Sequence, residues 1–439
     1  MRLSCLRLFA LAAAALATTP ATAQLTETER AMAACVEAGF EQDVALLERI
    51  VVQNSGTHNH DGVRKVAHML APEFEALGFK VEWIDQSAAG RTGHLFARHE
   101  GKPGTTRMLL IAHMDTVFEP DSGFEGFVRE GDIAIGPGVG DDKGGIVIIL
   151  AALRAIKAAG TLDDANIVVA LTGDEEEAGD PVDIARADLV KAAEWADVAL
   201  DFEGLSLMDG RDMAVIARRS ANNWTLRVTA GSGHSSGIFG EGASYGAIYE
   251  LARILDRFRQ ELPEENLTLN VGSTAGGTPA EISEDGLSVS AVGKTNIIPS
   301  SAVARGDLRT ISIEQTDRIA AAMQAIVDDN LPGTDATIEF AFRYPPMPPT
   351  EGNLALFGKL NAVSVDMGLS EMGVYPPAGR GAGDINFVAH LVDGIAGLGP
   401  GGTRSHAPGE TINLQTLTRQ AQRAAVLMSR LATEQGAGD

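Results

Sequence analysis

The first half of the chain is constrained above all by short apolar strands that alternate with amphipathic helices. The run 108–112 is apolar throughout, so a strand there would be buried on both faces of a sheet. Buried strands that alternate with helices are typical of a layered α/β domain. We predict strands at 80–84, 108–112, 166–171 and 198–202, and helices at 63–77, 144–159 and 182–193.

The pattern changes near residue 217. Residues 224–229 alternate between apolar and polar side chains, as in a strand with one exposed face. Further strands are predicted at 287–292, 302–310 and 337–342, with helices at 244–259, 313–329 and 414–432. Because 439 residues are too many for one ordinary core, we predict an α/β domain, residues 24–216 and 345–439, with an inserted α+β sandwich, residues 217–344.

The first 23 residues have the features of a signal peptide. Arg2 and Arg7 supply positive charge, 8–17 is an apolar run, and Ala21-Thr22-Ala23 is a small-x-small cleavage site. The alternative is a membrane anchor, but the apolar run is shorter than the roughly 20 residues of a membrane span. We therefore expect residues 1–23 to be removed, the product to be periplasmic or secreted, and no membrane association afterwards.

Charge and cysteine content exclude several classes of function. The formal net charge is −24, and so acidic a chain would repel the phosphates of nucleic acids. Of the two cysteines, Cys5 lies in the signal peptide, which leaves Cys35 alone. An internal disulfide and a cysteine-rich zinc site are therefore excluded, and a metal would have to be held by His, Asp and Glu.

Five polar segments, each at the end of an apolar strand or following one, contain the residues best able to bind a metal ion. In open α/β sheets, ligands bind at the edge where the carboxyl ends of the strands lie. Each segment alone also fits a plain loop, and the Gly-rich one lacks the G-x-x-x-x-G-K-[ST] pattern of a phosphate loop. The segments are 112–116 (AHMDT), 136–145 (GPGVGDDKGG), 172–177 (TGDEEE), 201–204 (DFEG) and 401–410 (GGTRSHAPGE).

Taken together, in order and spacing, these segments resemble the metal-site motifs of the zinc aminoacylase, glutamate carboxypeptidase and succinyl-diaminopimelate desuccinylase family of dinuclear-zinc metallopeptidases. The resemblance implies two Zn²⁺ ions per chain. It makes Asp141 the bridging ligand, often followed by a cis peptide bond, and Glu175 the general base. Asp115 would orient a ligand histidine, and Glu410 would orient the C-terminal one. The other implied ligands are His113 and Glu203 for one ion, and Glu176 and His406 for the other.

The same resemblance gives the inserted domain the role of a lid and dimerisation domain, so that a homodimer is expected. In this family the lid histidine, here His234, stabilises the oxyanion and often comes from the partner subunit. Asn296 matches an N-x-I-P segment, and Arg309 matches a D-x-R whose arginine binds the substrate carboxylate. Gly383 belongs to a Gly-rich loop that lines the substrate end.

The function expected from this resemblance is that of an exported zinc metallopeptidase of carboxypeptidase or dipeptidase type. It would release a free amino acid, possibly glutamate, by means of a metal-activated water with Glu175 as the base. The alternative is an N-acyl-amino-acid amidohydrolase, which shares the same motifs, so the substrate is a peptide or an N-acyl amino acid. A metal-free binding protein would predict broken ligand positions, whereas all five are intact.

Overall fold

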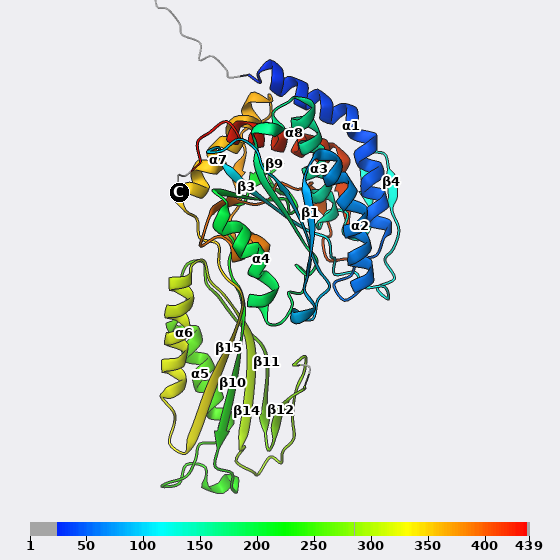
Figure 1. Cartoon of the computed structure of the whole chain (residues 1–439). Helices are drawn as coiled ribbons and strands as arrows, with labels where there is room; N and C mark the ends of the chain where they lie inside the picture. Colours follow the sequence, from blue (N-terminus) through cyan, green and yellow to red (C-terminus); the bar gives the residue numbers. More distant parts are fainter. Residues whose placement is uncertain (1–23, 285, 437–439) are drawn as a thin grey trace, which may run out of the picture.

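The computed structural model describes residues 24–284 and 286–436, so the predicted signal peptide lies outside the described residues. Within this part of the chain, none of the helices combines the length and the apolar character that a membrane crossing requires. The chain forms a layered α/β domain from which a smaller α+β sandwich projects (Figure 1). The predicted fold class is therefore confirmed. The predicted domain limits, 217 and 344, stay predictions.

A six-stranded sheet forms the centre of the α/β domain. Its strand order is β1-β2-β6-β3-β7-β17. Strand β3 runs parallel to β6 and β7, whereas β1 and β2 form an antiparallel edge. The carboxyl ends of β3, β6 and β7 therefore meet at one edge, as the motif placement requires. The strands are β1 (Lys80–Asp85), β2 (Gly93–His99), β3 (Arg107–His113), β6 (Asn166–Thr172), β7 (Val198–Asp201) and β17 (Asp393–Ile395).

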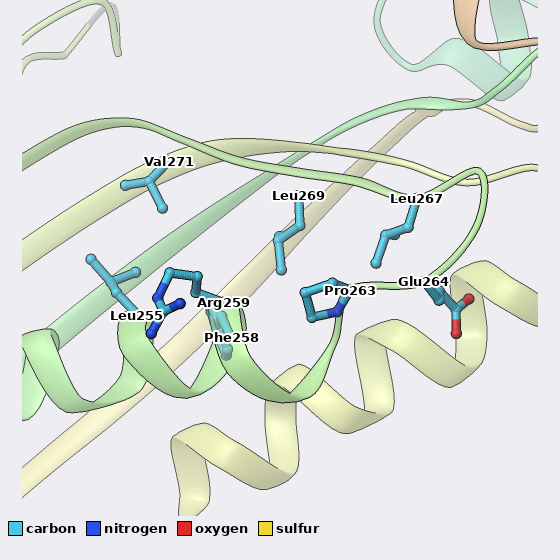
Figure 2. Close-up of a pocket in the computed structure, with 8 residues that line it drawn as sticks. All are labelled: Leu255, Phe258, Arg259, Pro263, Glu264, Leu267, Leu269 and Val271. Carbon is cyan, nitrogen blue, oxygen red and sulfur yellow. The ribbon is translucent and has the colours of Figure 1, made fainter.

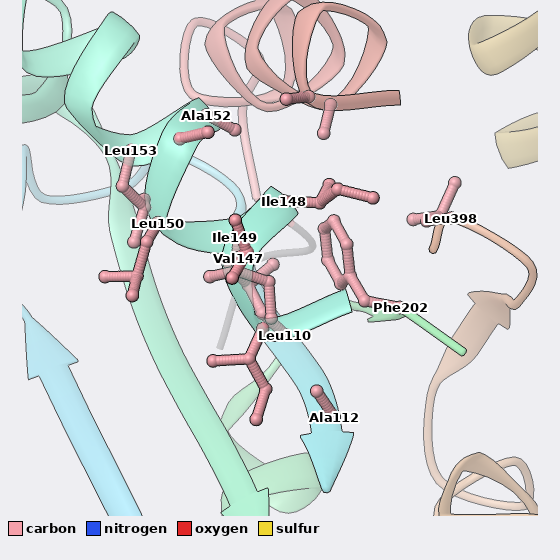
Figure 3. Packing of buried hydrophobic residues seen from close by; sticks show 14 of the residues in the cluster. Leu110, Ala112, Val147, Ile148, Ile149, Leu150, Ala152, Leu153, Phe202 and Leu398 are labelled. Carbon is pink, nitrogen blue, oxygen red and sulfur yellow. The ribbon is translucent and has the colours of Figure 1, made fainter. Parts of the chain in front are cut away.

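Helices cover both faces of this sheet. Leu110 and Ala112 of β3 pack into the core under α3 (Figure 3), while Leu109 and Ile111 belong to the core on the α4 side. Each large apolar side chain that is fully buried contributes roughly 1.5–3 kcal/mol, so the ends of these strands are held rigidly. The helices are α1 (Glu27–Val52), α2 (His60–Leu77), α3 (Lys143–Ala158), α4 (Val182–Trp195), α7 (Glu351–Asp366) and α8 (Leu414–Leu431).

The inserted domain, called the lid below, is a sheet of order β11-β14-β10-β15 with two helices on one face (Figure 1). Its core includes the buried Trp224, whose ring lies 6.0 Å from that of Phe258. Next to the edge strand β11, a cavity of about 390 Å³ is lined by residues of α5, of β11 and of the segment between them (Figure 2). The elements are β10 (Ala221–Ala230), α5 (Ala247–Glu261), β11 (Thr268–Gly277), β14 (Ser301–Arg309), α6 (Ile313–Asp328) and β15 (Thr334–Tyr344).

Several elements differ from the sequence-based expectation. The predicted strand at 287–292 is a shorter strand, β13 (Val289–Ala291), which pairs only with the three-residue β12 (Ala280–Ile282). Helix α1, strands β2 and β11 and helix α7 were not predicted. Short strands complete the fold: β4 (Val128–Glu130), β5 (Ile133–Ile135), β8 (Ser206–Met208), β9 (Arg211–Ala214), β16 (Gly373–Val374), β18 (Gly402–Thr403) and β19 (Thr411–Asn413).

The chain enters and leaves the lid through two adjacent segments. Arg218, before β10, and Met347, after β15, exchange backbone hydrogen bonds of 2.9 and 2.8 Å. The two crossings are thus fastened to each other at the α/β domain. The first crossing contains Arg218 and the second follows Tyr344, and both of these side chains contact the candidate metal centre.

Candidate metal centre

His113 is the last residue of β3, and Asp115 holds it in place. The Nδ1 atom of His113 lies 3.1 Å from the carbonyl oxygen of Asp115 and 3.4 Å from its Oδ1. The Asp115 carboxylate is fully buried and also accepts hydrogen bonds from the backbone N–H groups of Glu175 and Glu176 and from the Thr57 hydroxyl. Asp115 therefore orients the imidazole and fixes the backbone of the two glutamates at once.

The carboxylate of Asp141 lies between two histidines. Its Oδ1 is 3.1 Å from Nε2 of His113, and its Oδ2 is 3.1 Å from Nε2 of His406. Glu176 joins this cluster, with Oε2 3.0 Å from the same atom of His406. The peptide bond from Asp141 to Asp142 is cis, as the resemblance implies. One carboxylate that presents one oxygen to each of two imidazoles has the arrangement of a bridging ligand.

Glu410 supports the Gly-rich turn rather than His406. The sequence predicts that it orients the histidine. The structure instead shows its carboxylate accepting hydrogen bonds from the backbone N–H groups of Gly138, Gly140 and Asp141, at 3.0, 2.7 and 2.9 Å. The prediction is wrong because the turn folds back over Glu410 and offers it three backbone donors. Glu410 thereby positions Asp141, while His406 has a left-handed backbone conformation, with φ +62°, and its side chain contacts Asp141 and Glu176.

The charges of the cluster are strongly coupled. Burial opposes a charge on His113, but its hydrogen bonds to Asp115 and Asp141 raise its pKa well above the ordinary value. Hydrogen bonds to Asp141 and Glu176 raise the pKa of His406 to about 11. Burial raises the pKa of Glu175 well above its usual range and that of Glu176 to about 7. These buried carboxylates therefore favour a positive charge beside them.

The donor set fits a zinc-type cation. Ligand atoms of His113, Asp141 and Glu176 lie within 4.8 Å of one another, and Nε2 of His406 is in contact with the last two. Imidazole nitrogen and carboxylate oxygen are ligands that Zn²⁺ accepts. Because ligands bind metals in their deprotonated form, a cation would replace protons now shared among these groups. The residues present thus suit the metal implied by the resemblance.

Glu203 lines the same cavity, of about 250 Å³, as Asp141, Glu175 and His406. Its carboxylate pairs with two arginines, with Oε1 2.8 Å from Nη1 of Arg218 and Oε2 3.0 Å from Nη2 of Arg380. Burial opposes its ionisation, but the charge of Arg218 lowers its pKa. The cavity therefore places Glu203 beside the cluster, and its role as a ligand together with His113 stays a prediction.

A family model extends over most of the chain. The model of peptidase family M20/M25/M40 matches residues 109–430. The chain belongs to this family. The predicted family and enzyme class are therefore confirmed: the protein is a carboxypeptidase-like hydrolase of the M20 metallopeptidase and amidohydrolase class.

Similar proteins cover nearly the whole chain. Carboxypeptidase G2 of Pseudomonas sp. strain RS-16 is 26% identical over 402 residues, which are 90% of this chain and 89% of that protein. Succinyl-diaminopimelate desuccinylase of Gluconacetobacter diazotrophicus is 24% identical over 381 residues, 83% of this chain and 91% of that protein. The solved structure of aminopeptidase PepT from Bacillus cereus has a TM-score of 0.69 at 19% identity and covers 90% of this chain and 99% of its own. The fold is thus shared over 90% of this chain.

The residues that the resemblance assigns to substrate binding lie at different places in this M20 fold. Gly383 touches the site, since a Cβ there would lie 2.1 Å from Oε1 of Glu203. Arg309 lies at the end of the lid sheet nearest the α/β domain, where it pairs with Asp307 at 2.9 Å. His234 and Asn296 are exposed and belong to adjacent segments at the far end of the lid (Figure 1). Within one chain, the described structure does not bring these last two to the metal cluster.

Sequence reasoning missed a buried arginine that fastens the acidic loop of this M20 enzyme. Arg186 of α4 donates to Oδ1 of Asp174 at 2.6 Å and to Oδ1 of Asp384 at 2.8 Å. It thereby ties the acidic loop of Glu175 to the Gly-rich loop of Gly383. Arg186 lies on the buried side of an ordinary amphipathic helix, and only the charge at that position could have signalled its role.

Tyr344, at the end of β15, was also missed. Its hydroxyl donates a hydrogen bond of 2.5 Å to the backbone carbonyl of Glu175, and its ring packs on Phe387. Arg218, at the other crossing, holds Glu203. Both connections to the lid thus carry a side chain that contacts the site, so the position of the lid and the geometry of the site are linked.

The Tyr344→Phe variant is expected to lower kcat by about 3- to 10-fold, the equivalent of one hydrogen bond of about 1 kcal/mol, with little change in KM. The phenyl ring keeps the packing on Phe387, so only the hydrogen bond to the backbone carbonyl of Glu175 is lost. Steady-state kinetics on an amide substrate measures the effect. Tyr249→Phe, on an exposed face of the lid, is the matched control. An unchanged kcat in Tyr344→Phe would contradict the linkage.

Proposed function

We propose that this chain hydrolyses the amide bond of a peptide or an N-acyl amino acid and releases a free amino acid. The proposal includes two Zn²⁺ ions, held by His113, Asp141, Glu176, Glu203 and His406. The observation that carries it is the Asp141 carboxylate, which presents one oxygen to each of two histidines beside the buried Glu175. The relationship to carboxypeptidase G2 supports a carboxypeptidase-type reaction.

Glu175 has the position and the environment of the general base. Its Oε2 lies 4.0 Å from Nε2 of His113, and its side chain is 11% exposed to the cavity. Burial raises its pKa, which suits a group that accepts a proton from water and returns it to the leaving nitrogen. When bound, zinc would polarise the substrate carbonyl and lower the pKa of a bound water. Asp115 keeps the backbone of Glu175 in place during this transfer.

Arg309 is proposed to anchor the α-carboxylate of the substrate. It lies on the lid at the end nearest the α/β domain, its side chain is 33% exposed, and its guanidinium can form a bidentate pair with a carboxylate. The Arg309→Met variant is expected to raise KM for N-acetyl amino acids by at least about 10-fold, since a charge-assisted bond is worth about 1.5–3 kcal/mol. The corresponding amino acid amides, which lack the charge, should lose nothing. An unchanged KM of Arg309→Met for the N-acetyl amino acids would contradict the proposal that Arg309 binds the α-carboxylate.

The alternative function is that of an N-acyl-amino-acid amidohydrolase, an aminoacylase or deacylase. The similarity to a succinyl-diaminopimelate desuccinylase favours it. The chemistry at the metal would be the same, so a substrate panel separates the two. Faster hydrolysis of dipeptides than of N-acetyl and N-succinyl amino acids supports the carboxypeptidase or dipeptidase, and the reverse order supports the deacylase.

Export and dimerisation complete the proposal. Export rests on the sequence of residues 1–23, and N-terminal sequencing of the protein from a periplasmic or culture fraction tests it. A homodimer through the lid would allow His234 and Asn296, exposed at the far end of one chain, to serve the site of the other. Light scattering that found a fully active monomer would contradict this arrangement.

A further inference from the structure

The cavity beside the metal cluster contains two arginines that face its carboxylates. The residues that line it include Asp141, Glu175 and Glu203 on the acidic side, and Arg218 and Arg380 on the basic side. Arg309 is not among the lining residues. An anionic group that enters this cavity would be repelled by the three carboxylates, so a nearby guanidinium decides where it can bind.

Arg218 makes four hydrogen bonds within the chain. Its Nε and Nη2 donate to the carbonyl oxygens of Gly381 and Ala382, at 2.6 and 2.8 Å. Its Nη1 donates to Asp201 at 3.2 Å and to Glu203 at 2.8 Å. The side chain is 3% exposed. Arg218 therefore acts as a fixed, buried support between Glu203 and the Gly-rich loop.

Arg380 has donors to spare. In the described part of the chain, the hydrogen bond that its head group makes is the one from Nη2 to Oε2 of Glu203, at 3.0 Å. Its Nε is buried and has no hydrogen-bond partner, although buried donors are almost always paired. The side chain remains 21% exposed, on the wall of the cavity. Because that Nε is shielded from solvent, the donors left for an anionic partner at the cavity wall are those of Nη1 and the second N–H of Nη2.

We propose that Arg380 binds a second carboxylate of the substrate, in addition to the α-carboxylate, so that the enzyme prefers amides that carry two carboxylates. This inference rests on the proposed function. The second carboxylate could belong to the released amino acid, as in an aspartyl or glutamyl residue, or to the acyl group, as in a succinyl group. In either case the planar guanidinium of Arg380 binds the carboxylate, while Arg218 retains its hydrogen bond to Oε1 of Glu203.

Matched substrate pairs test the proposal. N-acetylglutamate and N-acetylglutamine differ by one charge on the amino acid, and N-succinylalanine and N-succinamoylalanine differ by one charge on the acyl group. The wild type is expected to favour the charged member of at least one pair by 10-fold or more in kcat/KM, the factor that about 1.4 kcal/mol represents. The pair that shows the preference identifies the source of the carboxylate.

The Arg380→Met variant keeps the bulk of the side chain and is expected to abolish that preference, because KM rises at least about 10-fold more for the charged member of the pair than for the neutral one. Arg380→Lys should retain part of it, because lysine keeps the charge but not the fork. Arg309→Met is the comparison, since it should affect both members of each pair equally. Zinc content is measured in every variant. An equal loss for both members in Arg380→Met, or no loss for either, would overturn the proposal.

Binding measurements separate this proposal from the proposed function. If the wild type hydrolyses neither these four compounds nor the dipeptides of the substrate panel, the proposed function fails, and calorimetry then decides on Arg380 alone. Zinc-loaded wild type should bind glutamate over glutamine, or succinate over succinamate, by 10-fold or more, and Arg380→Met should not. Equal affinities for the acid and the amide in the wild type, for both pairs, would contradict the role of Arg380.

Discussion

Replacing Glu175 by glutamine is expected to lower kcat by about 10²- to 10⁴-fold, the usual contribution of a positioned general base. Glutamine has nearly the same shape and leaves the backbone hydrogen bond to Asp115 intact, but it cannot accept a proton from water. Because Glu175 is expected to act as the base and not as a ligand, zinc content should stay at the wild-type value. Steady-state kinetics and metal analysis of the same preparation measure both results.

The neighbouring Glu177 provides a matched control. It is exposed and pairs with His58 and Arg91 at the surface, at 3.1 and 3.0 Å. Glu177→Gln makes the same chemical change two positions away and is expected to leave kcat within about 2-fold, because exposed ion pairs contribute about 0–1 kcal/mol. A Glu175→Gln variant that retained wild-type kcat with full zinc content would show that another group is the base.

Removal of the metal is expected to abolish hydrolysis and to destabilise the fold. Water has a pKa of about 15.7, and zinc lowers that of a bound water to about 7, so the metal-free enzyme should retain less than about 1% of the rate. A ligand that binds only the folded chain stabilises it by about 4 kcal/mol at 1,000 times its dissociation constant. Chelation should therefore lower the melting temperature, and added zinc should restore both rate and stability.

The Asp141→Asn variant tests the bridging position within the same experiment. An amide offers one weaker oxygen where the carboxylate offers two, so the variant is expected to hold less zinc after dialysis and to lose at least about 100-fold in rate. Asp121→Asn, in an exposed loop, is the control and should hold the wild-type amount. Full activity after complete chelation, or two retained zinc ions in Asp141→Asn, would contradict the proposed metal site.

Most of the α/β fold could be predicted because its strands are buried on both faces. The apolar runs at β3 and β6 are long enough for a buried strand, α2 and α4 have an amphipathic pattern, and α3 is apolar along most of its length. Helix α1 was not predicted, although Thr26 and Glu29 form a capping box at its start. Strand β11 was missed because it is a largely exposed edge strand that contains three glycines, and such strands lack a clear alternation.

The candidate ligands could be predicted because each is fixed by its local segment. His113 and Glu176 follow buried strands, and Asp141 follows a Gly-rich turn, so their neighbours in sequence already place them at one edge of the sheet. Their mutual contacts, with Asp141 between His113 and His406, agree with that placement. No comparable local signal exists for the residues that support them.

The sequence by itself therefore determined which polar segments end the buried strands, and its resemblance to the family supplied the candidate ligands and the candidate base. Only the tertiary structure decided which side chains support them. Arg380 meets Glu203 across 177 positions of sequence, and Glu410 meets the Gly138 turn across 272. The physical reason is that a strand end is set by local burial and periodicity, whereas a buried charge takes its partner from whatever segment the fold brings beside it. The supporting contacts that only the tertiary structure revealed include those of four side chains: Arg218, Arg380, Arg186 and Tyr344.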